Sequence, residues 1–333
     1  MLNDLNEVIK LPDYIWRGIR EARDLSWQRV GKKIYFYAPG FIYYYNKYFK
    51  SSSLSFPSIS ITGSYCSLKC DHCGGRILKT MIPARTPDKL IEICADLKER
   101  GATGCLISGG CLPNGSVPVS RFVDAISEIK KRFGLTIVVH TGLVDFEVAK
   151  RLKEAGVDAV SIDIVGSEET IKRIYHLNAS VDSYANTLEA LKKAELPFTP
   201  HVLIGLHYGS VRGEIEALKI ISKYNPSALI LIVFFPIKGT KMENINPPPY
   251  EAVIDILVKA RFLMNNIPIA LGCARPKGNY RSIVDLLFVE AGVNAIAFPS
   301  IEAIERAKKL GLKIVFSPTC CSLIQKDINL SSS

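Results

Sequence analysis

The sequence lacks any long apolar run. The longest uninterrupted one, Ala228 to Phe235, has eight residues, whereas a membrane-spanning helix needs about 20. The first ten residues, MLNDLNEVIK, include acidic side chains and no apolar segment before a small-residue cleavage site, so they do not resemble a signal peptide. We therefore expect a cytoplasmic protein with no membrane partner.

The sequence also lacks a dense run of basic residues, although 42 Lys and Arg against 32 Asp and Glu give a net charge of +10. The basic side chains are spread over amphipathic stretches such as EIKKRFG and ERAKKLG. Nucleic-acid-binding proteins usually concentrate them on one face. We therefore predict no nucleic-acid partner, and we expect the charge to steer an acidic protein toward the chain.

Cysteine, in contrast, is abundant, with nine residues in 333. A disulfide framework suits small secreted chains that cannot build a core, and this chain, with 48% apolar residues, can build one. In a reducing cytoplasm, clustered cysteines more often bind metal or do chemistry. The nine are Cys66, Cys70, Cys73, Cys94, Cys105, Cys111, Cys273, Cys320 and Cys321.

From residue 56 onward, short apolar runs alternate with amphipathic stretches of helical period. The predicted strands cover residues 58–63, 105–109, 135–141, 159–165, 198–206, 228–235, 267–272 and 295–300, with a ninth run at 312–318. Eight such repeats predict an α/β fold of the (β/α)8 TIM-barrel type, with a doubly wound sheet as the alternative. We expect three parts: an N-terminal helical and aromatic extension (1–55), the barrel (56–311), and a C-terminal extension (312–333) that carries the terminal cysteine pair.

The first predicted strand is followed by TGSYCSLKCDHCGG, which places Cys66, Cys70 and Cys73 in a C-x3-C-x2-C array. Three thiolates on one loop can hold three irons of a [4Fe–4S] cluster and leave the fourth iron open to a substrate or cofactor. The alternative is structural zinc with His72 as the fourth ligand. Structural zinc prefers two C-x2-C knuckles, and the sequence has no second one.

With this array, the chain resembles the radical S-adenosylmethionine (SAM) superfamily and its biotin-synthase-like branch. Further similar segments are SGG (108–110), SIDIVGS, VLIGLHYG, FFPIKGTKM and GCARPKG. The resemblance implies that SAM binds the open iron and is cleaved by one electron to methionine and a 5′-deoxyadenosyl radical, which takes a hydrogen atom from the substrate. The SAM contacts that it implies are His72, Ser108, Gly109, Gly110, His140, Asp163, Ile204 and Gly205. His72 stands where the family usually has an aromatic residue, and Cys111 where it often has an acidic one.

The other cysteines fall into two groups. Cys94 lies on the apolar face of a predicted helix, and we expect it in the core; Cys105 begins a strand, and we expect it inside the barrel. The four thiols that follow strand ends are Cys111, Cys273, Cys320 and Cys321. Because parallel strands of a barrel end at one mouth, we predict that these four ligate a second [4Fe–4S] cluster that donates sulfur. Adjacent cysteines do not easily face one cluster, so only one of the terminal pair should be essential.

The aromatic N-terminal segment, SGGCLPNG, IYHLNAS and the terminal cysteine pair together resemble the archaeal two-protein lipoyl synthases. That resemblance implies a sulfurtransferase acting on C6 and C8 of a protein-bound octanoyl chain, with a second radical SAM protein and an electron donor such as ferredoxin. The carrier would be an acidic lipoyl domain or a glycine-cleavage H-type protein. The chain lacks the C-x4-C-x5-C array of the bacterial enzyme, and we interpret its serine-rich end, Ser331 to Ser333, as an ordinary polar terminus.

Two other functions remain open from the sequence. A radical mutase or hydrogenase-cofactor maturase would use the SAM cluster without a sulfur donor. A non-catalytic iron–sulfur or SAM sensor would bind without turnover. About eight irons per chain favours sulfur insertion and about four with turnover favours the mutase, whereas no release of 5′-deoxyadenosine favours the sensor.

Overall fold

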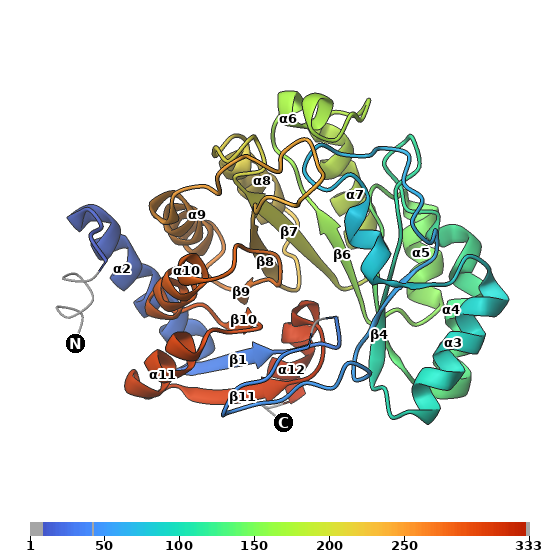
Figure 1. Ribbon diagram of the computed structural model, residues 1–333, viewed down its shortest axis with the longest axis horizontal. Coiled ribbons are helices and arrows are strands. Elements are labelled where there is room, and N and C mark those ends of the chain that lie inside the picture. Colours follow the sequence, from blue (N-terminus) through green and yellow to red (C-terminus); the bar gives the residue numbers. More distant parts are fainter. Residues whose placement is uncertain (1–8, 42, 331–333) are drawn as a thin grey trace.

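The alternation of apolar runs and amphipathic stretches forms one parallel sheet covered by helices (Figure 1). The computed structural model describes residues 9–41 and 43–330. The strands are β1 (Lys33–Tyr37), β2 (Ser58–Ser60), β3 (Ile82–Pro83), β4 (Gly104–Ser108), β5 (Thr136–His140), β6 (Ala159–Asp163), β7 (Phe198–Ile204), β8 (Leu229–Val233), β9 (Ile269–Leu271), β10 (Ala295–Ala297) and β11 (Lys313–Ser317). All nine predicted strands are therefore confirmed.

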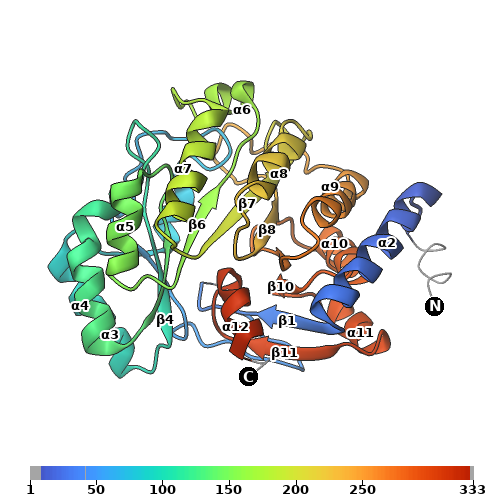
Figure 2. The same ribbon diagram turned by 180° about the vertical axis from the view of Figure 1, so that it is seen from behind.

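The helices that connect the strands lie on the outside of the sheet, as Figures 1 and 2 show from opposite sides. The α-helices are α2 (Asp13–Val30), α3 (Pro87–Glu99), α4 (Val123–Phe133), α5 (Phe146–Glu154), α6 (Glu168–Arg173), α7 (Val181–Lys193), α8 (Glu214–Ser222), α9 (Tyr250–Leu263), α10 (Asn279–Glu290), α11 (Ile301–Lys309) and α12 (Ile324–Leu330). Three short 3-10 helices are η1 (Arg76–Thr80), η2 (Val119–Phe122) and η3 (Cys321–Leu323).

The sheet has 11 strands in the order β11-β1-β10-β9-β8-β7-β6-β5-β4-β2-β3 and is curled into a half-barrel. The prediction of an α/β barrel of TIM type is confirmed in this curled form. Within the described residues, β11 and β3 remain the two edges, because β1 pairs with β10 and β11 pairs with β1. The segment expected to be a helical and aromatic extension thus also supplies a strand, in which Tyr35, Phe36 and Tyr37 are buried.

The C-terminal segment lies in the opening between the two edges of the curled sheet, where Figure 1 shows α12 between β1 and β4. Tyr37 donates a hydrogen bond of 2.6 Å to the Asp327 carboxylate. On the other side, the hydroxyls of Ser322 and Ser161 of β6 are 2.9 Å apart. The end of the chain therefore connects β1 on one side of the half-barrel with β6 on the other. Its side chains pack against those of the inner face of the sheet.

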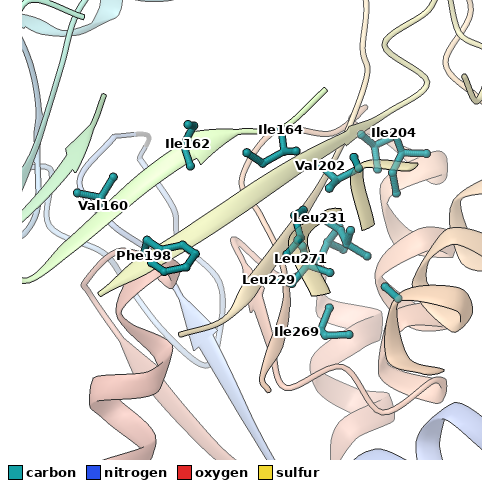
Figure 3. Close-up of a cluster of buried hydrophobic side chains, with 14 of the residues drawn as sticks. Val160, Ile162, Ile164, Phe198, Val202, Ile204, Leu229, Leu231, Ile269 and Leu271 are labelled. Atoms are coloured by element: carbon teal, nitrogen blue, oxygen red, sulfur yellow. The ribbon is translucent and has the colours of Figure 1, made fainter. Parts of the chain in front are cut away.

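Side chains alternate between the two faces of each strand, and this decides which residues reach the hollow. Figure 3 shows Val160 and Ile162 of β6 with Phe198, Val202 and Ile204 of β7 in the outer core, under the helices. Each fully buried aliphatic side chain of this kind contributes roughly 1.5–3 kcal/mol. The side chains of the alternating positions lie on the inner face instead. They include Ser161, Asp163, Thr199 and His201.

The alternation of side chains along β4 places Cys105 differently from the prediction. Cys105 and Ile107 of β4 are fully buried in the outer core, and the Cys105 thiol hydrogen-bonds to Cys94 of α3, which raises the pKa of Cys105. The prediction that Cys105 lies inside the barrel was therefore wrong, because its position in the strand turns it toward the helices. The prediction that Cys94 is a core residue is confirmed.

The N-terminal helix α2 was predicted from Trp16, Ile19 and Ala22 at helical spacing, and all three are buried. The helix packs against α9, as both ribbon views show. In the part of the chain that the structure describes, no helix has the length and apolar character to cross a membrane.

Candidate functional site

The loop after β2 brings the cysteine array together. Cys70 and Cys73 are buried, and Cys66 is half-buried. The Cys70 carbonyl accepts hydrogen bonds from the N–H groups of Cys73 (3.2 Å) and Gly74 (2.7 Å), which closes a tight turn. As a result, the ligand atoms of Cys70, His72 and Cys73 lie within 4.8 Å of one another. The prediction that this loop forms a metal-binding group fits its geometry.

The electrostatics of the loop favour a thiolate. A hydrogen bond from Cys70, together with the neighbouring His72 ring, lowers the pKa of Cys73 to about 4 despite burial. The shared hydrogen bond and burial raise the pKa of Cys70 in turn. A thiolate is the form in which cysteine binds metal.

The glycine segment after β4 packs directly against this loop. The Gly110 N–H donates a hydrogen bond of 2.7 Å to the Thr62 hydroxyl, and the Ser67 N–H donates one of 2.8 Å to the Cys111 carbonyl. A Cβ atom on Gly110 would lie 2.0 Å from the Tyr65 carbonyl oxygen and 2.6 Å from Cys66. Position 110 therefore requires glycine if Cys66 is to stay in place.

We expect Gly110→Ala to displace the cysteine loop, because backbone atoms on the facing side leave no room for a methyl group. Overpacking of this kind costs roughly 1–3 kcal/mol. The variant should bind less iron after anaerobic reconstitution, as measured by iron content and visible absorbance. Gly109→Ala is the matched control, since its Cβ would meet side-chain atoms of Thr62 and Ile61 at 3.1–3.2 Å, which can shift. Full iron content in Gly110→Ala would contradict this account.

Asp71, between two cysteines of the array, ties the loop to three other loops. Its carboxylate lies 2.6 Å from His176 Nε2, 2.9 Å from Lys241 Nζ and 3.4 Å from the Tyr208 hydroxyl. Burial alone would raise the pKa of Asp71, but Lys241 and His176 outweigh it and lower the pKa. Sequence reasoning missed this clasp, because its partners lie more than 100 positions away along the chain.

A second polar group lies on the inner face of the sheet, at the ends of β5, β6 and β7. His140 Nε2 is 3.5 Å from the Asp163 carboxylate, and the rings of His140 and His201 are 5.9 Å apart. Burial would raise the pKa of Asp163, but the hydrogen bond with His140 and the nearby imidazoles lower it to about 2. Burial lowers the pKa of His201 to about 4. Asp163 is thus an ionised acceptor beside a neutral imidazole.

The residues between these two groups fit a polar ligand. Within the described residues, the Nδ1 atom of His72 and the hydroxyl of Tyr175 are buried without a hydrogen-bond partner. The two rings are 5.4 Å apart, and Tyr175 is close enough to Asp163 for the carboxylate to raise its pKa, after the larger effect of burial. A cluster on the cysteine loop with SAM beside it would give these orphaned groups partners. Tyr175 belongs to the IYHLNAS segment, but no role was predicted for it, because its nearness to Asp163 depends on the fold.

Two predicted SAM contacts lie elsewhere than their strand suggested. The Ile204 side chain is in the outer core, under the helices (Figure 3). The Gly205 N–H donates a hydrogen bond of 2.8 Å to the buried carboxylate of Glu214. Any contact of Ile204 with a nucleoside would therefore come from its backbone. Ser108 is nearly buried, and its hydroxyl lies 3.4 Å from the His140 carbonyl.

The four thiols predicted for a second cluster separate into two places. Cys111 lies beside the first array: burial and the charges of Cys66, Asp163 and Cys73 raise its pKa to about 12. Cys320 is within electrostatic reach of Cys273, which is solvent-exposed, and of His140. A hydrogen bond from Cys321 lowers the pKa of Cys320 to about 7. The predicted tail Ser331–Ser333 lies outside the described residues.

Comparisons with known proteins point to one family. Residues 60–219 match the sequence model of the radical SAM superfamily. The chain is 26% identical over 226 residues to a biotin synthase of Leptospira biflexa serovar Patoc, covering 65% of this chain and 62% of the relative. It is 23% identical over 243 residues to a biotin synthase of Leptospira interrogans serovar copenhageni, covering 72% and 68%. It thus spans about two thirds of the length of these relatives.

Solved structures show the same fold at low sequence identity. Methylornithine synthase superposes with a TM-score of 0.61 at 17% identity, covering 98% of this chain and 95% of that one. HydG, a maturase of the [FeFe]-hydrogenase, superposes with a TM-score of 0.66 at 16% identity, covering 97% and 74%. These likenesses concern the half-barrel and its extensions alone.

Proposed function

Because the chain carries a radical SAM superfamily domain and fits the biotin-synthase-like branch, we propose that it inserts sulfur into an unactivated carbon of a protein-bound octanoyl chain. In this proposal it forms a two-protein lipoyl synthase with a second radical SAM protein. A low-potential one-electron donor such as ferredoxin supplies the electrons. Membership of the radical SAM superfamily implies an enzyme that binds SAM at an iron–sulfur cluster.

The observation that carries the proposal is a second thiol group that shares the half-barrel with the first. The array of Cys66, Cys70 and Cys73 lies on the loop after β2. Cys273 follows β9 and Cys320 follows β11, and the two thiols interact with each other. Cys320 also interacts with the inner-face residue His140. An alkyl carbon must be held near both a hydrogen-atom acceptor and a sulfur source. Asp163 lies within electrostatic reach of His72 on the cysteine loop and of His140 beside Cys320, which supports that requirement.

When bound, the two centres supply the electron that cleaves SAM and the sulfide that replaces the hydrogen atom transferred to the nucleoside. The protein's own residues position the reactants. Asp163, ionised because its pKa is about 2, would accept hydrogen bonds from the ribose hydroxyls of bound SAM, and the unpaired Tyr175 hydroxyl would be a donor beside it. Gly110 and Asp71 hold the cysteine loop against the sheet.

The proposal is tested by anaerobic reconstitution of the full chain with SAM and a reductant, followed by mass spectrometry of an octanoylated lipoyl domain. We expect a mass gain from sulfur, with the second radical SAM protein needed for the complete product. Release of 5′-deoxyadenosine without sulfur on any carrier would favour the mutase instead. No release of the nucleoside would favour a sensor.

The acidic carrier gives a further prediction. The net charge of +10 should speed association with an acidic domain, and screening weakens such steering as salt rises. We expect the association rate to fall by about an order of magnitude between about 0.05 M and 0.5 M salt, as measured by stopped-flow fluorescence. A neutral octanoylated peptide serves as the control. A rate that is independent of salt, or tight nucleic-acid binding at physiological salt, would contradict the predicted partner.

A further inference from the structure

Two imidazoles lie together on the inner face of the half-barrel, one at the end of β5 and the other in the middle of β7. His140 ends β5 and His201 lies on β7, with Asp163 of β6 between them. Ligand atoms of all three lie within 4.8 Å of one another. The two rings are 5.9 Å apart and inclined by 62°, in an edge-to-face arrangement. The alternation of each strand directs these side chains into the hollow.

The hydrogen bonds of the two rings leave one nitrogen of each free to bind metal. His201 Nδ1 is 3.1 Å from the Thr199 carbonyl oxygen. A carbonyl only accepts, so Nδ1 carries the proton and Nε2 keeps its lone pair. His140 Nε2 faces the Asp163 carboxylate at 3.5 Å, which likewise leaves Nδ1 for a ligand. Metal-bound histidines almost always donate their other ring N–H to a carbonyl or a carboxylate.

One thiol lies near this group, although it is not among the residues whose ligand atoms lie within 4.8 Å of one another. Cys320 lies within electrostatic reach of His140 and of Cys273. Cys111 instead interacts with Cys66 and Cys73. Imidazole and thiolate together are ligands for iron and zinc, and two histidines can replace two cysteines on an iron–sulfur cluster. The inner-face group therefore offers more ligands than the thiols alone.

We infer that His140 and His201, together with Cys320, are ligands of an iron–sulfur cluster inside the half-barrel. This inference rests on the proposed function in one respect, since it assigns ligands to the second cluster that sulfur insertion requires. It differs from the sequence-based ligand set in adding two histidines, in keeping Cys320 alone of the four thiols, and in leaving Cys111 to the SAM-binding loop. It also assigns His140, predicted as a SAM contact, to the second cluster. Asp163 orients His140 and remains available to the nucleoside.

The test uses the full chain with Cys66→Ala, Cys70→Ala and Cys73→Ala, so that signals come from the second cluster alone. After anaerobic reconstitution, we expect this background to keep about half of the wild-type iron and to show nitrogen hyperfine couplings in pulsed EPR of the reduced protein. Adding His140→Ala and His201→Ala should remove most of the remaining iron. His207→Ala is the matched control, because that ring pairs with Thr170 at 3.0 Å, away from the group.

A variant that exchanges one ligand type for another distinguishes loss of a ligand from misfolding of the protein. His201→Cys in the same background should retain iron while the nitrogen couplings weaken, which a merely structural histidine would not produce. Iron and couplings that persist in the double histidine variant would overturn the inference and leave sulfur insertion untouched. Zinc in place of iron would overturn it as well. A background without any second-cluster iron, while both histidines are intact, would overturn the proposed function and this inference together.

Discussion

Changing Cys66, Cys70 and Cys73 together to alanine is expected to remove about four irons per chain and to abolish SAM cleavage. The three thiols lie on one loop: the ligand atoms of Cys70 and Cys73 lie within 4.8 Å of each other and of His72, and Cys66 is within electrostatic reach of Cys70. Without them the loop keeps one imidazole and no thiolate, which is too few ligands to hold a cluster. The measurements are iron content and release of 5′-deoxyadenosine under reducing conditions.

The matched control for the triple variant is Cys94→Ala. Cys94 is fully buried in the outer core, where it contacts Cys105, so its loss should lower stability without removing iron. This pair of variants separates loss of a ligand from loss of any cysteine. SAM cleavage that persists in the triple variant would contradict the assignment of the array.

The second large effect is expected from Cys320→Ala: a protein that still cleaves SAM, yields no sulfurated product and binds roughly four fewer irons. The Cys320 thiol interacts with His140 and Cys273 on the side of the hollow. Cys321, its neighbour, also interacts with Cys273, but the effect of His140 falls on Cys320. Cys321 instead raises the pKa of the Tyr37 phenol of β1, after the larger effects of burial and Asp327. Cys321→Ala is therefore the control, with iron and product retained.

This pair also tests the expectation that only one of two adjacent cysteines serves the cluster. The comparison is sharp because the two thiols are equally buried and belong to the same apolar cluster, so packing losses should be similar. Loss of iron in both variants would contradict the assignment, and so would retention of iron in both. If both variants keep their iron, a radical mutase becomes the better interpretation.

The strands could be predicted where each run is apolar on both faces and bounded by turns, as in ALILIVFF, which forms β8. The strand β1 was missed, because KIYFY follows a helical pattern and stands in an aromatic segment with no rhythm of its own. Its place beside β10 depends on contacts with residues more than 250 positions away. The position of α12 in the opening of the half-barrel is equally nonlocal.

The site shows the same division between local and long-range information. The cysteine array could be predicted, because its spacing alone brings the ligands onto one turn. The ion pairs of Asp71 could not be predicted, since their partners come from other loops. The burial of the Tyr175 hydroxyl without a partner could not be predicted either, since it depends on the packing around it. The inner-face pairing of His140 with His201 depends on which face each residue occupies, and a shift of one position reverses that face, as Cys105 illustrates.

The central claim, that the protein's own second cluster donates sulfur to an alkyl carbon, is tested most directly by isotope labelling. The full chain is reconstituted anaerobically with ³⁴S-sulfide and given unlabelled SAM, a reductant, the second radical SAM protein and an octanoylated lipoyl domain. We predict ³⁴S in the product, in an amount limited by the chain's own second cluster and lost in Cys320→Ala. Nucleoside release with no ³⁴S in any product would contradict the claim.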